Sequence, residues 1–182
     1  DLHIHSRFSR ATSEQMNIPE IGKFAKIKGL NLIGTGDFTH PEWLKEIKHT
    51  LTPEQDSNLF KLTNLDSSIR FILTTEVCTI FNYKNDSKKI HHVILTPSLE
   101  TAEQINERLQ NFGSLSSDGR PILNVSAPQL VEEVMSVSND NMIFPAHAWT
   151  PWFSIFGAFN GFDTVEDCYQ DMTKHIHALE TG

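Results

Sequence analysis

The sequence contains little cysteine, and its cysteines are not arranged for a disulfide framework or a thiolate zinc site. Cys78 and Cys168 are the two cysteines in 182 residues, and neither belongs to a CxxC pair. Disulfide-rich secreted domains and thiolate zinc sites need more cysteines at closer spacing. We therefore expect a cytoplasmic protein that works in a reducing compartment.

Long apolar runs and an excess of positive charge are also missing. No stretch approaches the roughly 20 apolar residues that a membrane-spanning helix needs, so we expect no membrane partner. Fifteen Lys and Arg residues against 23 Asp and Glu residues give a formal net charge of −8. No global positive field therefore attracts nucleic acid, and a phosphate-bearing substrate must be held by local groups.

Three common enzyme signatures are absent. The sequence has no GxxxxGK[ST] phosphate loop and no GxSxG nucleophile turn, and Gly34-Thr35-Gly36 lacks the third glycine of a dinucleotide fingerprint. These absences argue against a helicase-like motor, a serine hydrolase and a nicotinamide enzyme.

Helical and strand-like patterns alternate along the chain. Helices are predicted over about 18–28, from Pro41 onward, over 98–112 and from about 127 onward. Strands are predicted over 1–5, 30–34, 70–81, 90–96, 122–125 and 142–146, with 53–68 mostly loop. The runs 70–81 and 90–96 form a predicted hairpin. The alternation favours the α/β class, with a parallel sheet or barrel whose active site lies at the carboxyl ends of the strands.

Histidines and carboxylates gather at or near these predicted strand ends. They are His3, His5, His40, His91, His92 and His147, with Asp1, Asp37 and Glu76. Imidazole and carboxylate without thiolate suit Zn²⁺, Mn²⁺ or Fe²⁺, and a carboxylate such as Glu76 can bridge two ions. The sequence therefore predicts a metal centre with two or more ions.

The order of these motifs resembles that of the polymerase and histidinol phosphatase (PHP) superfamily of metal-dependent phosphoesterases. Asp1-Leu2-His3-Ile4-His5 is similar to its opening D-x-H-x-H motif, and Asp37 to His40 is similar to its second motif. Glu76 matches the bridging acid, and His92 and His147 match the next two histidines. Longer strings are similar to the endonuclease Q family within it, namely 6–13, 34–41, 117–121 and 145–152.

The resemblance implies a distorted (β/α)7 TIM-like barrel of the PHP type, incomplete at its C-terminal end. The superfamily's last motif, a second Asp-x-His that follows the final strands, is not reached by Gly182, and Ala11 stands where many members have another histidine. We expect residues 1–182 to form a single PHP-type catalytic domain, truncated before the last metal motif.

The resemblance also implies a function. The protein would be a metal-dependent hydrolase, a DNA repair endonuclease that cuts 5′ of deaminated bases (uracil, hypoxanthine, xanthine) and of abasic sites by means of a metal-activated water. It would hold two to three divalent ions (Zn, Mn, Mg or Fe). Its substrate would be lesion-containing DNA, and repair or replication partners would bind through other regions.

Carried over residue by residue, the resemblance implies a ligand set. His3 and His5 would hold one metal, and Glu76 would bridge it to a second metal held by His92 and His147. Asp37 and His40 would serve a third metal or the substrate phosphate, so that Glu76, Asp37 and His40 are the catalytic candidates. Asp1 would orient the first histidines.

His91 and His92 compete for one ligand position, because side chains alternate across a strand and only one of the two faces inward. The resemblance favours His92 as the ligand, which leaves His91 as a candidate substrate contact. A second pair, His175 and His177, is expected to be structural.

The segment 148–162 is rich in aromatic residues. Its rings form either a satellite hydrophobic cluster or a place where an extruded base stacks, with Trp149 and Trp152 as the substrate-binding candidates.

Two other functions stay open at this level. One is a PHP-type phosphatase that acts on small phosphate monoesters such as histidinol phosphate. The other is a barrel that has lost catalysis and serves as a binding module. Bound metal would argue against the second.

Overall fold

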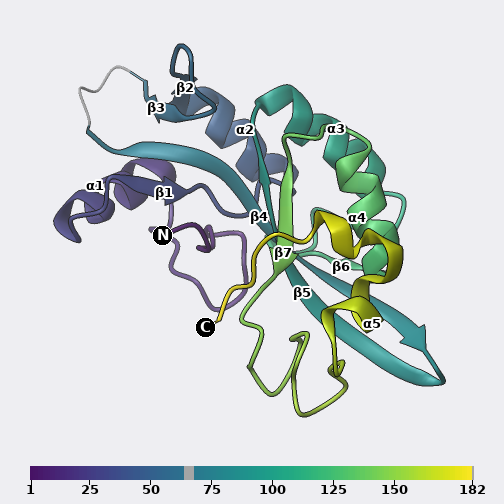
Figure 1. Cartoon of the computed structure of the whole chain (residues 1–182). Coiled ribbons are helices and arrows are strands. Elements are labelled where there is room, and N and C mark those ends of the chain that lie inside the picture. Colours follow the sequence, from purple (N-terminus) through teal and green to yellow (C-terminus); the bar gives the residue numbers. More distant parts are fainter. Residues whose placement is uncertain (64–67, 182) are drawn as a thin grey trace.

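A computed structural model describes residues 1–63 and 68–181 of the chain and shows a mixed α/β fold (Figure 1). The helices are α1 (Ile18–Ile27), α2 (Pro41–Thr50), α3 (Leu99–Leu109), α4 (Ala127–Met135) and α5 (Val165–Tyr169), followed by the 3-10 helix η1 (Gln170–His175). The strands are β1 (Leu32–Gly34), β2 (Leu51–Pro53), β3 (Phe60–Leu62), β4 (Arg70–Tyr83), β5 (Asp86–Thr96), β6 (Ile122–Leu123) and β7 (Met142–Pro145). The predicted α/β class is confirmed.

The hairpin of β4 and β5 organises the sheet. β4 pairs with β5 in antiparallel register from Leu73 opposite Thr96 to Tyr83 opposite Asp86, and β7 pairs antiparallel with the other edge of β5. β1 and β6 pair with β4 in parallel. β1, β4, β6 and β7 therefore run in one direction, and β5 runs against them. The predicted hairpin is confirmed, and both of its strands are longer than predicted.

The sheet is open rather than closed into a barrel. Its described strands follow the path β2-β3-β4-β5-β7, with β1 and β6 beside β4. The expectation of a TIM-like barrel is not met by this part of the chain, because no described strand pairs β7 back to β1. The return strand β5 also makes the sheet mixed, whereas the alternation of helices and strands favoured a parallel sheet or barrel.

The N-terminal segment 1–5 lies beside β1 without being a strand itself. The Gly34 N–H donates to the Asp1 carbonyl at 2.7 Å, and the Asp1 amino group reaches the Leu32 carbonyl at 3.2 Å. A Cβ at Gly36, whose φ is +65°, would strike the Ile4 carbonyl. Glycine at this position therefore allows the close approach that brings the first two histidines against the sheet.

Side-chain caps start three of the helices where the sequence places them. The Asn17 side chain accepts from the Glu20 N–H, and the Ser98 and Ser126 side chains accept from N–H groups three residues later. Such caps satisfy backbone donors that the first helical turn leaves free. Pro41 begins α2 as predicted. These helices pack over a core that includes Trp43, Phe71 and Leu130.

The stretch 53–68 was predicted to be mostly loop, and the structure corrects this in part. β2 and β3 form a short antiparallel pair from Leu51 opposite Leu62 to Pro53 opposite Phe60. Each strand has three residues, which is too short for a period-two pattern to stand out in the sequence. Residues 64–67 lie outside the described part of the chain.

Among the helices that the structure describes, none has the length and apolar character needed to cross a membrane.

Candidate metal centre

Glu76 stands at the middle of a cluster of four imidazoles. It lies in β4 with 1% of its surface exposed. Its Oε1 lies 2.8 Å from Nδ1 of His91, 3.1 Å from Nε2 of His147 and 3.5 Å from Nε2 of His3. Its Oε2 lies 3.2 Å from Nε2 of His5. One carboxylate is therefore shared by histidines from the N-terminal segment, β5 and the loop after β7.

The cluster divides into two groups of possible metal ligands that have Glu76 in common. His3, His5 and Glu76 form the first, and Glu76, His91 and His147 form the second, with the ligand atoms of each group within 4.8 Å of one another. Two imidazoles and one carboxylate oxygen form a set that suits zinc, manganese or iron. The structure thus brings together His3, His5, Glu76 and His147, as the sequence predicted.

The structure places His91, and not His92, in this cluster. In the β4–β5 register Cys78 is opposite His91, and Val77 is opposite His92. Opposite residues share a face and side chains alternate along a strand, so His91 lies on the face of Glu76 and His92 on the other face. The alternation was visible in the sequence, but the register that decides between the two histidines was not. We therefore replace His92 by His91 in the ligand set.

His92 has a closed set of partners in the core. Its Nδ1 lies 2.9 Å from the Tyr169 hydroxyl, and its Nε2 lies 3.0 Å from the Thr79 hydroxyl. His92 and Tyr169 have no exposed surface. Burial lowers the pKa of His92 to about 3, so the ring is neutral at physiological pH. This histidine ties β5 to α5 and has no free nitrogen to offer a metal.

Asp37 contacts the His5 ring on the side that faces away from Glu76. Its Oδ1 lies 2.9 Å from Nδ1 of His5, and its Oδ2 accepts from the Ser6 N–H, the Ser6 hydroxyl and the Ser9 hydroxyl at 2.7–2.8 Å. A carboxylate bound to the far nitrogen of an imidazole fixes the ring orientation and makes the other nitrogen a better ligand. The structure gives Asp37 this orienting contact and places it in neither ligand group of the described chain.

His40 stands apart from Glu76. It precedes α2, and its ring stacks on Phe8 with 4.3 Å between the centroids. Its Nδ1 is buried with no hydrogen-bond partner in the part of the chain that the structure describes. Burial lowers the pKa of His40, despite a backbone hydrogen bond to Ser116 that raises it. His40 contributes no atom to either ligand group.

Glu180 is a site residue that the sequence analysis missed. Its carboxylate oxygens lie 2.8 and 2.9 Å from Nδ1 of His3, and Oε2 also accepts from the His147 N–H at 2.7 Å. It therefore orients the ring of His3, the role that the resemblance gave to Asp1, and it also holds the backbone of His147. Asp1 is exposed, and its backbone rather than its carboxylate makes the contacts with β1. The contact joins the two ends of the chain, which lie near one another (Figure 1).

The charges of the cluster are strongly coupled. Burial alone would raise the pKa of Glu76, but the surrounding imidazoles of His147, His3, His5 and His91 outweigh burial and hold that pKa far below its usual range. Burial also acts to lower the pKa of His5, but Asp37 and Glu76 raise it to about 9. The pKa of His3 is raised as well, by Glu76 and Glu180 against burial. Without metal, the raised pKa of His5 keeps a proton on that ring, and its positive charge faces the buried carboxylates of Glu76 and Asp37.

The residues present fit a metal. Nε2 of His3 is buried and makes no hydrogen bond within the described residues, although it faces Glu76. A buried, unpartnered imidazole nitrogen that faces a carboxylate has the geometry and chemistry that a metal ligand needs. His3 and His5 also have a carboxylate on the opposite ring nitrogen, which is typical of metal-bound histidines.

A pocket of about 440 Å³ opens beside the second group. His91, Phe153, Cys78 and Ile122 line it, together with Ser117, Asp118, Arg120 and Arg10. Nη1 of Arg120 lies 3.4 Å from Oε2 of Glu76. Burial raises the pKa of the Cys78 thiol to about 12, so it is not a thiolate. Arg120 was not predicted as a site residue, although the string 117–121 that contains it was singled out.

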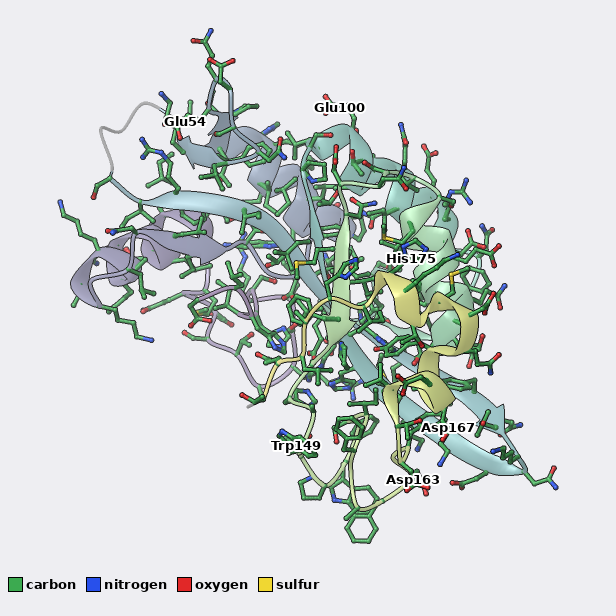
Figure 2. All side chains as sticks on the ribbon, in the orientation of Figure 1. Glu54, Glu100, Trp149, Asp163, Asp167 and His175 are labelled. Atoms are coloured by element: carbon green, nitrogen blue, oxygen red, sulfur yellow. The ribbon has the colours of Figure 1, made fainter. Side chains whose placement is uncertain are left out.

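The aromatic loop after β7 is largely exposed. Trp149 and Trp152 have 62% and 57% of their surface exposed, and they stack on Phe156 and Phe159, respectively. Figure 2 shows Trp149 on the loop beyond the end of β7, away from the helices. Phe153 lies nearer the cluster, with its ring centroid 4.9 Å from that of His91. The two tryptophans therefore form part of an outer aromatic surface and do not line the pocket beside Glu76.

The second H-x-H pair does not reach the cluster. His175 ends η1 (Figure 2), and His177 is exposed. Neither belongs to a ligand group in the described chain.

Comparison with known proteins gives a consistent set of relatives. No protein-family model matches the chain. An uncharacterised protein of Methanocaldococcus jannaschii is 38% identical over 168 residues, which are 92% of this chain and 18% of that protein. The crystal structure of the lesion-specific endonuclease PfuEndoQ from Pyrococcus furiosus matches with a TM-score of 0.82 and 37% identity, over 100% of this chain and 41% of that one.

A second solved structure is endonuclease Q in complex with a 27-mer duplex that has an abasic lesion at the active site. It matches with a TM-score of 0.83 and 37% identity, over 100% of this chain and 42% of that one. The chain thus resembles endonuclease Q along its whole length, and it spans less than half the length of these relatives.

Proposed function

We propose that this chain is the metal-dependent catalytic portion of a DNA repair endonuclease of the endonuclease Q type. The single observation that carries the proposal is the Glu76 cluster, in which one buried carboxylate is shared by two ligand groups. Its support is the match to endonuclease Q at 37% identity over the whole chain, including a complex with lesion-containing DNA. The resemblance of the motifs to the PHP superfamily agrees with both.

In this proposal His3 and His5 would hold one divalent ion, His91 and His147 would hold a second, and Glu76 would be shared by both. When bound, such ions act as Lewis acids that lower the pKa of water toward about 7 and neutralise charge on phosphate oxygens. Asp37 and Glu180 fix the ring orientations of His5 and His3. Asp37 therefore serves catalysis through His5. For His40 we retain only the proposal that it serves a further metal or the substrate phosphate.

The substrate we propose is DNA that contains a deaminated base (uracil, hypoxanthine or xanthine) or an abasic site, cut on the 5′ side. The exposed rings of Trp149 and Trp152 suit contact with bases, because every nucleobase has a face that stacks on an aromatic ring. We propose His91 as a metal ligand; because it also lines the pocket beside Glu76, it stays a candidate for contact with the substrate.

Further strands outside these 182 residues would close the open sheet into the PHP-type barrel, since the solved relatives are more than twice as long as this chain. Residues 1–182 would then be part of one catalytic domain. Both cysteines are free and buried, which agrees with our proposal of a cytoplasmic protein.

The test is cleavage of an end-labelled duplex with one uracil by the full natural protein, with Mn²⁺, Mg²⁺ or Zn²⁺ and a chelated control. We expect a metal-dependent nick immediately 5′ of the uracil, absent from the undamaged duplex and from the Glu76→Gln variant. No nick by a protein shown to contain metal would contradict the proposal. Activity on small phosphate esters would then indicate a phosphatase, and a protein that takes up no metal would indicate a binding module.

A further inference from the structure

Arg120 brings a positive charge to the edge of the metal centre. Its Nη1 lies 3.4 Å from Oε2 of Glu76, the same oxygen that faces His5. A third of its side chain is exposed, toward the pocket that His91 and Phe153 line. The Arg120 guanidinium thus contacts Glu76 on one side and is open to the pocket on the other.

The loop that carries Arg120 is fixed by backbone contacts. The Arg120 N–H donates to Oδ1 of Asp118 at 3.0 Å, and the Gly119 N–H donates to the Phe8 carbonyl at 3.0 Å. A Cβ at Gly119 would strike the Asp37 carboxylate and the Ser9 hydroxyl. The loop therefore packs directly on Asp37, which orients His5. This contact fixes the position of the Arg120 backbone.

Arg10 adds a second positive charge at the mouth of the same pocket. Its Nε lies 3.4 Å from Oδ2 of Asp118, and 88% of its side chain is exposed. Asp118 thus holds both the Arg120 backbone and the Arg10 side chain on one wall. In a chain with a net charge of −8, this is a local pair of cations next to the ligand groups.

A metal-loaded centre changes what Arg120 can pair with. Glu76 would then give its oxygens to the ions, and the guanidinium would stand beside positive charge without a full counter-charge. An anion between the ions and Arg120 removes this repulsion. A guanidinium offers parallel N–H donors that match two oxygens of a phosphate.

We propose that Arg120, assisted by Arg10, forms a phosphate-binding site at the edge of the Glu76 cluster, and that it holds non-bridging oxygens of the phosphodiester to be cut. The assignment to a phosphodiester rests on the proposed function. The phosphate site itself rests on the arginines, the pocket and the shared carboxylate. Arg120 is on this account a substrate-binding residue rather than a metal ligand.

The first test uses inorganic phosphate as the probe, with the metal-loaded full protein and calorimetry. We expect Arg120→Ala to weaken phosphate binding about 10- to 100-fold, the effect of losing one charge-assisted hydrogen-bonding group. Arg120→Lys should bind phosphate with intermediate affinity, because lysine keeps the positive charge but lacks the two parallel N–H donors of the guanidinium. The matched control is Arg108→Ala, which removes an exposed arginine on α3 paired with Glu133 and should bind phosphate as the parent does.

The second test uses the uracil duplex. We expect Arg120→Ala to lower kcat/KM about 10- to 100-fold with metal content unchanged, and inorganic phosphate to inhibit this variant at about tenfold or more higher concentration than the parent. Parent-like phosphate binding and cleavage in Arg120→Ala would overturn the proposal. Loss of metal in both Arg120 variants would also overturn it, since Arg120 would then act only by holding Glu76.

The two proposals can fail separately. A parent protein that binds phosphate through Arg120 but does not cut uracil-containing DNA would retain the phosphate site and reject the endonuclease. A parent that cuts this DNA while Arg120→Ala cuts equally well would retain the endonuclease and reject the site.

Discussion

His91 and His92 are neighbours in β5, yet they belong to two different kinds of polar environment. His92 has a hydroxyl partner on each ring nitrogen and no exposed surface. His91 shares Oε1 of Glu76 with His147, and its Nδ1 lies only 3.1 Å from a nitrogen of that second ring. One arrangement is complete as it stands. In the other arrangement, nitrogens of His91 and His147 share a single carboxylate oxygen, so not every ring nitrogen has a partner of its own.

This difference shows how a functional site can be told from a structural polar cluster. A buried structural network satisfies each donor and acceptor once, because unpaired polar groups are costly to bury. The Glu76 cluster has four imidazoles and a guanidinium around a single carboxylate, and one imidazole nitrogen in it has no hydrogen-bond partner in the described chain. Such an excess of ligand atoms is what the proposed metal ions would satisfy.

The largest effect should come from Glu76→Gln, which removes the charge that both ligand groups share. We expect loss of both metal ions and a fall in cleavage of more than about 100-fold, beyond what removal of an outer partner costs. Metal content is measured by mass spectrometry of the purified variant. Retention of both ions with near-parent activity would show that Glu76 does not bridge.

The matched pair His91→Phe and His92→Phe should separate the two environments. We expect His91→Phe to lose one metal ion, with the unfolding free energy of the metal-free protein changed by less than about 1 kcal/mol. We expect His92→Phe to keep both ions and to lose about 1–3 kcal/mol of stability, because the Tyr169 and Thr79 hydroxyls would be left buried without their partner. Metal content and denaturant unfolding measure the two effects. The reverse pattern would restore His92 as the ligand.

Glu180→Gln should have a smaller effect on the same centre. The amide keeps the shape of the Glu180 side chain but removes the negative charge that faces Nδ1 of His3. We expect a 10- to 100-fold loss in affinity for one metal ion, the usual cost of an outer partner, with the fold retained. Competition with a chromogenic chelator measures it. An unchanged affinity would mean that His3 is oriented by backbone packing alone.

The smallest effect should be the pH dependence of the metal-free protein. The pKa of His5 is about 9 in the folded chain against an ordinary 6.5. The stability that this protonated histidine contributes is fully present below about pH 6.5 and is lost as the pH rises toward 9. We expect the Tm in chelator to fall over this range, and the fall to be smaller in His5→Asn. An equal fall in both proteins would contradict the assignment.

The sequence predicted most of the elements and much of the cluster that the structure brings together around Glu76. Caps at Asn17, Ser98 and Ser126 and the apolar runs of the hairpin are local signals, so the helices and the hairpin could be located from them. The choice between His91 and His92 depended on a register of one residue, which no local pattern encodes. Glu180 lies 177 residues from His3, and only the folded chain brings the two together.

The most direct test of the account is anomalous diffraction from crystals of the protein soaked with Zn²⁺ or Mn²⁺. We expect two peaks on either side of Glu76, one ligated by His3 and His5 and the other by His91 and His147, with His92 still bonded to Tyr169. No peak at Glu76, or a peak ligated by His92, would contradict it.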